Sequence, residues 1–473
     1  MTTIHGFTDE FAALDAVATA ELVRTKQASP AEVVAAAIER AKAVNPELNA
    51  VAAEDHERAR AMAAGADTYG VFAGVPTYIK DGTDVAGIAT RQGSEALHRA
   101  GPAKATAPVA QQLFDMGTIN LGKSTLPEWG FTASTEFPDG TATHNPWNLA
   151  HTPGGSSGGA AALVAAGVVP IAYVQDGGGS IRIPAACAGL VGLKHTRGRL
   201  VPYPDDRLLP VKIVVDGVLT RTVRDTAAYF RDAEVRYRAP KLPPLGDVAT
   251  PLDRPLRVGT FLDSPGGGAV DPATRRTHEA TVALLEGLGH RVEPVAPPVG
   301  AAFAEDFIHY WSMLAYAVQR AGHKLYDPTF DRTRLTMLTD GLASRFRSRM
   351  AQTPGAIRRL RGSTARVEEW MRSGGFDVVL TPTIGQLPPE LGYLGTTLPF
   401  DVLFPRVQEW VGYTPLANAS GGPSISLPLG HDDTSNLPIG MMFSGRFGDD
   451  GLLLRLALQL EEAHPFPTLD PRR

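Results

Sequence analysis

The sequence predicts a single large α/β domain that carries a helical insertion. Between residues 71 and 226, short apolar strands alternate with Gly-rich turns and Ala-rich helices, which is typical of a covered, largely parallel sheet. Strand signals return beyond a mostly helical stretch at 301–374, which we therefore interpret as an insertion into one body. The 473 residues would suffice for three domains, but no repeat or low-complexity tract divides them.

Residues 1–70 are predicted to form a helical arm that packs on this body. Ser29 is interpreted as a helix N-cap, because Pro30 follows at the first helical position and Glu32 completes a capping box. Apolar residues then recur at helical spacing, and Asn45-Pro46 is expected to end the helix.

The rest of the chain is divided into a core segment at 71–236, a Pro-rich surface connection at 237–256, and a remainder at 257–473 that includes the insertion. The predicted strands are 117–122, 168–174, 256–262, 291–295, 376–380, 424–427 and 439–443. Outside the arm and the insertion, helices are predicted at 158–167, 273–288 and 451–462.

Composition and charge favour a soluble globular enzyme over a protein that binds nucleic acid or membranes. A hydrophobic fraction of 43% and a charged fraction of 20% are ordinary for a soluble globular enzyme. Lys and Arg number 45 against 50 Asp and Glu, a net charge of −5 without a local basic run. Neither nucleic acid nor a membrane is therefore an expected partner.

The cytoplasm is the expected location. The single cysteine, Cys187, cannot form an intrachain disulfide, which fits a reducing compartment, and we interpret it as a small buried apolar residue. The N-terminal MTTIHGFTDEF lacks the basic and apolar regions of a signal peptide. No run of about 18 apolar residues could span a membrane.

Two short motifs match known patterns but lack the required context. Gly117–Ser124 (GTINLGKS) matches the Walker A pattern, yet its middle residues resemble a strand interior rather than a phosphate-binding loop. Gly154–Gly158 (GGSSG) matches a nucleophile elbow, but two prolines and two asparagines precede it instead of a strand. The twelve histidines show no metal-ligand spacing, so neither a metal nor a cofactor is expected.

The stretch from residue 154 to residue 199 carries the strongest chemical signal. Ser156 in GGSSGG and Ser180 in DGGGS each lie in a Gly-rich turn before a predicted helix. Glycines let a substrate approach the backbone closely, and consecutive N–H groups in such a turn can hold an oxyanion. With Lys80 in the YIKDG segment, the two serines indicate nucleophilic chemistry.

These segments resemble the amidase signature family. The run from GGSSGG to DGGGSIRIPAACAGLVGLKHTRGR is similar to its signature segment, and FAGVPTYIKDGTDVAG is similar to its lysine-bearing strand. Weaker similarity covers nearly the whole chain, including SPAEVV, NPWNL, the TPT at 381–383, SGGPSISLPLG and LPIGMMFSG. Within the family, the N-terminal arm and the C-terminal strands are most similar to those of 6-aminohexanoate-cyclic-dimer amidases.

The resemblance implies a central mixed, twisted sheet covered by helices, and a Ser-cisSer-Lys triad. Ser180 would be the nucleophile, Ser156 the bridging serine and Lys80 the base. Four backbone N–H groups would form the oxyanion hole, those of Gly177, Gly178, Gly179 and Ser180. Two further side chains match positions that hold the site together by hydrogen bonds, Ser157 and Asp176.

This chain departs from the family pattern at two places. Val174-Gln175-Asp176 stands where the family usually has Gly-Thr-Asp, and His195 replaces the proline of Gly-Leu-Lys-Pro-Thr. Neither departure touches the triad, so the implied reaction class is unaffected. The geometry of the oxyanion loop beside Gln175 stays open.

A serine hydroxyl becomes a good nucleophile only if a base takes its proton. Lysine in water is protonated at neutral pH, so Lys80 must be buried away from an unscreened acid to serve as that base. Asp81 and Asp84 are close in sequence, but in a strand Asp81 points opposite to Lys80. We therefore expect a neutral Lys80 that relays the proton of Ser180 through Ser156.

The expected activity is hydrolysis of a small aliphatic, aryl or cyclic carboxylic amide through a serine acyl-enzyme. In the family, the loop that here holds Trp129, Phe131 and Thr132 helps to line the acyl pocket, which suits an apolar or aryl group. Two alternatives remain: the glutaminase subunit of a tRNA-dependent amidotransferase, and a non-catalytic binding protein on the same fold. Whether the chain forms a homodimer also stays open, because no interface signature is found in the sequence.

Overall fold

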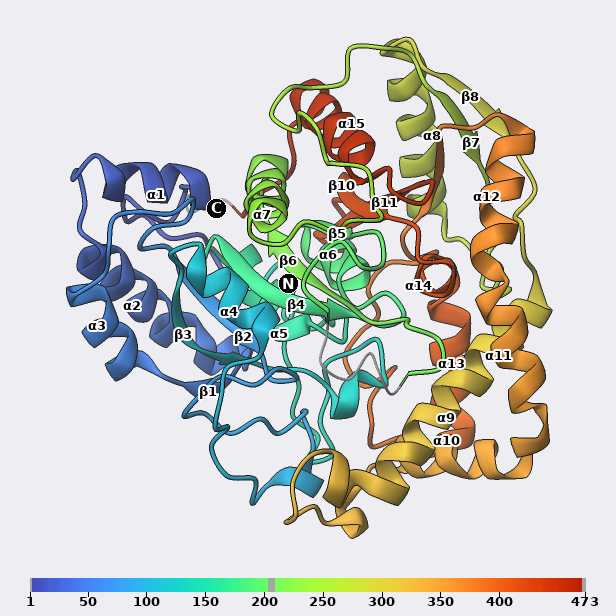
Figure 1. Cartoon of the computed structure of the whole chain (residues 1–473), viewed down its shortest axis with the longest axis horizontal. Helices are drawn as coiled ribbons and strands as arrows, with labels where there is room; N and C mark the ends of the chain where they lie inside the picture. Colours follow the sequence, from blue (N-terminus) through green and yellow to red (C-terminus); the bar gives the residue numbers. More distant parts are fainter. Residues whose placement is uncertain (1, 203–208, 470–473) are drawn as a thin grey trace.

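Eleven strands form one continuous sheet in this computed structural model, which describes residues 2–202 and 209–469 (Figure 1). The strands are β1 (Val51–Glu54), β2 (Pro76–Lys80), β3 (Ile119–Ser124), β4 (Ile171–Asp176), β5 (Val191–Lys194), β6 (Val215–Thr220), β7 (Arg257–Thr260), β8 (Arg291–Pro294), β9 (Val378–Pro382), β10 (Ser424–Asp432) and β11 (Leu437–Gly445). Their order in space is β1-β3-β2-β4-β6-β5-β10-β11-β9-β7-β8.

The sheet is mixed, as the family resemblance implies. β2 pairs in parallel with β3 and β4, and β7 with β8 and β9, whereas the other neighbours are antiparallel. The expectation of a largely parallel sheet, drawn from strand–helix alternation alone, is therefore wrong. A short connection such as that between β10 and β11 forces antiparallel pairing, while only a crossover allows parallel pairing.

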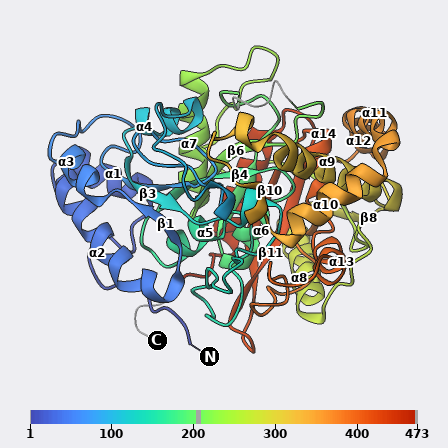
Figure 2. The ribbon, with the colours of Figure 1, turned by 90° about the horizontal axis from the view of Figure 1, so that it is seen from below.

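Helices cover both faces of the sheet and its two ends. They are α1 (Ala16–Arg24), α2 (Pro30–Leu48), α3 (His56–Ala64), α4 (Pro108–Asp115), α5 (Gly158–Ala165), α6 (Arg182–Ala188), α7 (Val223–Arg236), α8 (Pro272–Gly287), α9 (Ala301–Leu325), α10 (Met337–Ser348), α11 (Thr353–Arg361), α12 (Ser363–Gly374), α13 (Phe400–Trp410), α14 (Pro415–Ser420) and α15 (Asp450–Ala463). The insertion helices α9–α12 lie together on the side of the molecule opposite α1–α3 in both views (Figures 1 and 2).

Side-chain alternation along the central strands separates two layers of the core. Ile79 and Tyr173 belong to the larger apolar cluster, which includes side chains of α7, α8 and α15. Tyr78 and Val174 belong to the second cluster, which includes side chains of α2 and α5. Because successive strand residues face opposite ways, Lys80 lies on the face of Tyr78 and points toward the start of α5.

The N-terminal arm matches the sequence expectation only in part. The capping box at Ser29 is present, but α2 continues through Pro46 to Leu48. A proline near a helix end removes only one hydrogen bond, and α2 ends instead at Asn49, which adopts a left-handed conformation and donates its N–H to the carbonyl of Asn45. The arm also contributes β1, which pairs antiparallel with β3 and was not expected.

The Pro-rich connection at 237–256 contains no helix or strand, yet Leu245, Val248 and Leu252 are buried in the larger cluster. The division of the chain into an arm, a core segment, a connection and a remainder stays a prediction. The core segment at 71–236 includes residues 203–208, and the remainder includes 470–473, which lie outside the described residues.

Both rejected motifs adopt the conformations that the sequence indicates. Residues 119–124 of the Walker-like segment are β3 itself, and residues 125–153, which lead into the GGSSG turn, contain no strand. Within the part of the chain that the structure describes, no helix is long and apolar enough to cross a membrane.

Candidate active site

Lys80, Ser156 and Ser180 line one cavity of about 600 Å³. Lys80 is the last residue of β2, Ser156 precedes α5, and Ser180 lies in the turn between β4 and α6. The structure therefore brings together the three side chains that the family resemblance singles out.

Lys80 is held by the two serines of the GGSSGG turn. Its Nζ donates to Ser156 Oγ at 2.7 Å and to Ser157 Oγ at 2.8 Å. Ser157 Oγ donates in turn to the carbonyl oxygen of Ser180 at 2.6 Å, so its own hydrogen is used and it can only accept from Lys80. Ser156 Oγ has no second partner among the described residues, so its hydroxyl can exchange donor and acceptor roles with the amine.

The peptide bond between Gly155 and Ser156 is cis, which is the arrangement that the resemblance implies.

Burial lowers the pKa of Lys80 to about 7, and the carboxylates of Asp176 and Asp216 oppose that fall. Neither acid forms an ion pair with the amine in the described structure. Asp216 Oδ1 accepts from the hydroxyl of Tyr173 and, at 3.2 Å, from the side chain of Gln175. Asp81 pairs with Lys123 at 3.1 Å, on the opposite side of the strand from Lys80.

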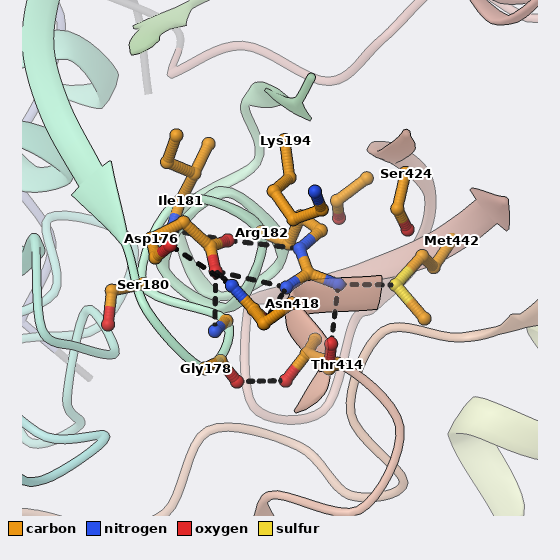
Figure 3. A network of polar contacts seen from close by, with 12 residues as sticks. Asp176, Gly178, Ser180, Ile181, Arg182, Lys194, Thr414, Asn418, Ser424 and Met442 are labelled. Atoms are coloured by element: carbon orange, nitrogen blue, oxygen red, sulfur yellow. Dashed lines mark hydrogen bonds and ion pairs between the residues drawn. The ribbon is translucent and has the colours of Figure 1, made fainter. Parts of the chain in front are cut away.

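Asp176, at the end of β4, organises the turn that carries Ser180 (Figure 3). Its fully buried carboxylate accepts from five donors: the N–H groups of Gly179 and Ile181 at 2.7 and 3.1 Å, two nitrogens of Arg182 at 3.0 Å each, and the amide of Asn418 at 2.8 Å. Burial alone would raise the pKa of Asp176, but the Arg182 guanidinium and these hydrogen bonds hold it below its usual value. Ser180 points away from this network in Figure 3.

The loop from Gly177 to Ser180 presents backbone donors at the cavity. The N–H of Gly179 is used by Asp176, whereas the N–H groups of Gly177, Gly178 and Ser180 find no acceptor in the described part of the chain. Thr414 Oγ1 donates to the Gly178 carbonyl at 2.6 Å and fixes the loop from outside. Gly179 has a φ of 136°, and a Cβ there would lie 2.3 Å from Thr414 Oγ1, so only glycine fits.

The two departures from the family pattern, Gln175 and His195, differ in how close they lie to the cavity. Gln175 lines the cavity, and its side chain donates to Asp216, so it affects the surroundings of Lys80 directly. His195 is buried with its Nδ1 donating to the carbonyl of Thr196, and burial lowers its pKa to about 4. His195 is not among the residues that line the cavity.

The walls of the cavity are mainly apolar. Trp129, Phe131 and Thr132, the predicted pocket residues, all line it. Helix α9 contributes a second wall that includes Phe303, Phe307, Trp311 and Leu314. Lys80 is the only charged residue among the described lining residues.

Sequence reasoning missed several residues that shape the site. Gly130 touches Ser156, since a Cβ at Gly130 would lie 2.6 Å from Ser156 Oγ. Its place between two predicted pocket residues was a local signal for such close contact. Thr414 and Asn418 gave no signal, because they reach the loop from α14 and the residue before it, far along the chain.

No group of three or more His, Cys, Asp or Glu side chains within residues 2–202 and 209–469 could hold a metal ion.

Replacing Gly130 by alanine should displace Ser156. The new methyl group would meet Ser156 Oγ at 2.6 Å, so we expect a crystal structure of Gly130→Ala to show the 2.7 Å bond between Lys80 and Ser156 lengthened or broken. If Ser156 takes part in the reaction, misplacement on this scale should slow turnover by about 100-fold.

Gly140→Ala is the matched control. Gly140 also has a left-handed φ, of 84°, but a Cβ there meets nothing within 4 Å. It carries the same kind of backbone strain without a clash, and its activity should stay near that of the wild type. Equal losses in both variants would contradict the contact as the cause.

An Amidase family model matches residues 32–454. "Putative amidase AmiC" of Mycobacterium tuberculosis (strain ATCC 25618 / H37Rv) is 47% identical over 469 residues, 98% of either chain. The 6-aminohexanoate-cyclic-dimer hydrolase of Pseudomonas sp. (strain NK87) is 34% identical over 97% of this chain and 96% of its own.

A solved structure of 6-aminohexanoate cyclic dimer hydrolase has the same fold, with a TM-score of 0.88 and 30% identity over 99% of this chain and 100% of that one. The match to the family model covers most of the chain, and both relatives align over nearly their whole length. The chain therefore belongs to the amidase family and is a hydrolase that acts on amides.

Proposed function

We propose that this chain is a serine amidase in which Ser180 attacks the amide carbonyl, Ser156 relays protons and Lys80 is the base. The observation that carries the proposal is the 2.7 Å bond between Lys80 and Ser156 in a cavity that Ser180 shares. Burial lowers the pKa of Lys80 to about 7, so a large fraction of the amine is neutral at physiological pH. A base with a pKa near the working pH is the most effective one.

Acylation begins when Ser180 Oγ forms a bond to the carbonyl carbon. The hydroxyl proton passes to Ser156, which gives its own proton to Lys80. The negative charge on the former carbonyl oxygen is stabilised by the N–H groups of Gly177, Gly178 and Ser180. The Lys80 ammonium then returns a proton through Ser156 to the leaving nitrogen, the C–N bond breaks, and the amine departs.

Deacylation uses the same relay with water in place of Ser180. A water oxygen bonds to the acyl carbon while its proton passes through Ser156 to Lys80. The bond between Ser180 Oγ and the acyl carbon breaks, and Ser180 recovers a proton from the relay. The sum is an amide and a water converted to a carboxylic acid and an amine.

The cavity supports uncharged amides with bulky apolar groups as substrates. A small aliphatic amide would leave most of the 600 Å³ empty, whereas an aryl or cyclic amide can contact the aromatic walls. A charged group would lose its hydration among these walls, where Lys80 is the only charged residue that the structure describes. The relative named for the cyclic dimer of 6-aminohexanoate supports the same substrate class.

The glutaminase alternative receives less support from the cavity. Free glutamine carries an ammonium and a carboxylate, and each needs a charged or strongly polar partner when buried. Lys80 is the only charged residue on the described walls, and the proposed mechanism uses it as the base. A non-catalytic role is also less supported, because the lysine and both serines meet in one cavity.

Ser180→Ala should abolish turnover while leaving the fold intact. The Ser180 hydroxyl has no hydrogen-bond partner in the described structure, so its loss should not change the melting temperature. We expect hydrolysis to fall by at least about 1,000-fold. A fluorophosphonate probe should label Ser180 of the wild type, as read by peptide mass spectrometry.

Ser124→Ala serves as the control for that variant. Ser124 is a fully buried serine whose hydroxyl, like that of the half-buried Ser180, has no hydrogen-bond partner among the described residues, but it does not line the cavity. Its activity should stay close to the wild-type value. Labelling of another residue, or a nearly active Ser180→Ala, would reassign the nucleophile.

The kcat/KM for an uncharged amide should rise with pH through about 7 and then level off. Below that pH Lys80 is an ammonium and cannot accept a proton, because its pKa is about 7. Asp216→Asn removes a carboxylate that raises the pKa of Lys80, so the rise should move to lower pH. Asp84→Asn, the same charge change at an exposed position, should move it little. A midpoint that is unchanged or higher in Asp216→Asn would contradict the assignment of the base.

A matched substrate panel should separate the amidase proposal from the glutaminase alternative. The hexanoyl anilide and the 6-aminohexanoyl anilide differ by one terminal ammonium, and we expect kcat/KM to be about 100-fold lower for the charged one. Glutamine should react slowest of all. Comparable hydrolysis of glutamine and the hexanoyl anilide would favour the glutaminase.

A further inference from the structure

Glu128 is a buried carboxylate next to the site that the proposed mechanism does not use. Its side chain is 4% exposed. Ser94 Oγ donates to one oxygen at 2.6 Å, and the N–H and hydroxyl of Thr336 and the hydroxyl of Thr339 donate to the other at 2.9, 2.7 and 2.5 Å. Burial raises the pKa of Glu128, and these donors oppose the rise. A carboxylate with so many partners is a structural anchor.

The anchor joins two distant parts of the fold. Glu128 begins the short 3₁₀ turn Glu128–Gly130, which belongs to the central body. Thr336 is the N-cap of α10, the second helix of the insertion seen in Figure 1. A helix N-terminus favours a negative charge, which adds to the hydrogen bonds. Glu128 therefore ties the 128–130 turn to the insertion.

The turn itself needs outside support. Trp129 has a φ of 47°, a left-handed conformation that is uncommon for a non-glycine residue. Its N–H donates to the carbonyl of Gln92 at 2.8 Å. Its ring contacts those of Tyr326 and Phe330 of the insertion, with centroids 5.6 and 5.9 Å away. Glu128 and Trp129 thus attach the turn to the same inserted segment.

The far end of the turn sets the space available to Ser156. Gly130 approaches Ser156 so closely that a Cβ on it would meet Ser156 Oγ at 2.6 Å. That oxygen is also the one 2.7 Å from Lys80 Nζ. A small shift of the turn would therefore free Ser156 to move away from the amine.

We propose that Glu128 is a positioning residue that holds the 128–130 turn against the insertion and so keeps Ser156 on Lys80. The inference rests on the proposed function, because it gives Ser156 the relay role. Glu128 touches neither Lys80 nor Ser180 and acts only through Gly130 and Ser156.

Two substitutions at position 128 distinguish the effect of its hydrogen bonds from the effect of its negative charge. Glu128→Ala removes all four hydrogen bonds, and we expect the rate of fluorophosphonate labelling of Ser180, and kcat, to fall by about 10-fold to 100-fold. KM should change less than kcat, because Glu128 itself does not line the cavity and the wall formed by α9 stays in place, although Trp129 and Gly130 of the turn do line it. Glu128→Gln can still accept from Thr336 and Thr339 and can donate to Ser94, so it should restore the rate to within about threefold of wild type.

A double-mutant cycle with Ser156→Ala tests the route of the effect. If Glu128 acts through Ser156, then Glu128→Ala should slow labelling by less than about twofold once Ser156 is alanine. The inference would be overturned if Glu128→Ala slowed labelling as much in the Ser156→Ala background as in the wild type. It would also be overturned if Glu128→Ala did not slow labelling in the wild type. A Ser156→Ala variant labelled as fast as wild type would instead overturn the proposed function, which keeps the two failures distinct.

Two further variants test whether slower labelling in Glu128→Ala reflects only a loss of stability. Asp225→Ala also removes a buried carboxylate, one that accepts from the N–H groups of residues 16 and 17 on α1 and does not line the cavity. It should lower the melting temperature without slowing the labelling of folded protein. If Glu128→Ala does not fold, Thr339→Val removes a single donor and should slow labelling by about threefold to tenfold. An unchanged rate in Thr339→Val would then count against the inference.

Discussion

The proposed mechanism depends on a buried lysine that has no carboxylate partner among the described residues. Two acids lie close enough to raise the pKa of Lys80, Asp176 and Asp216. Asp176 is held by Arg182 and Asn418, and Asp216 accepts from Tyr173 and Gln175. A direct ion pair would keep the amine charged, since an opposite charge favours the ionised form. The hydrogen-bond networks behind the site therefore decide whether Lys80 can act as a base.

The site and its substrate cavity come from different parts of the fold. The central strands β2 and β4 and the turns beside α5 and α6 supply the lysine, the serines and the oxyanion loop. The insertion supplies much of the apolar wall through α9. The 128–130 turn is one of the places where these two parts meet, so in the proposed mechanism a change in the insertion affects Ser156 as well as the substrate.

The sequence singled out the three side chains that meet in the cavity better than the residues that support them. Ser156 and Ser180 lie in Gly-rich turns, which are a local pattern, whereas the strand and the role expected for Lys80 came from the resemblance to the amidase signature family. Thr414 and Asn418 hold the loop through contacts made only on folding, and no local pattern points to them. Strand–helix alternation alone suggested a largely parallel sheet, because periodicity does not show the direction in which strands pair. Pro46 likewise failed to end α2, because a proline this near the helix end costs only one hydrogen bond and the left-handed Asn49 ends the helix instead.

The protonation of Lys80 in solution is the most direct test. In protein labelled with ¹³C at the lysine ε-carbons, the NMR signal that is absent from Lys80→Met reports this amine, and it must be assigned because burial also lowers the pKa of Lys194 to about 7. We expect the Lys80 signal to titrate near pH 7, far below the ordinary value of 10.5. A Lys80 that titrates near 10.5 would be an ammonium throughout the neutral range and could not take the serine proton.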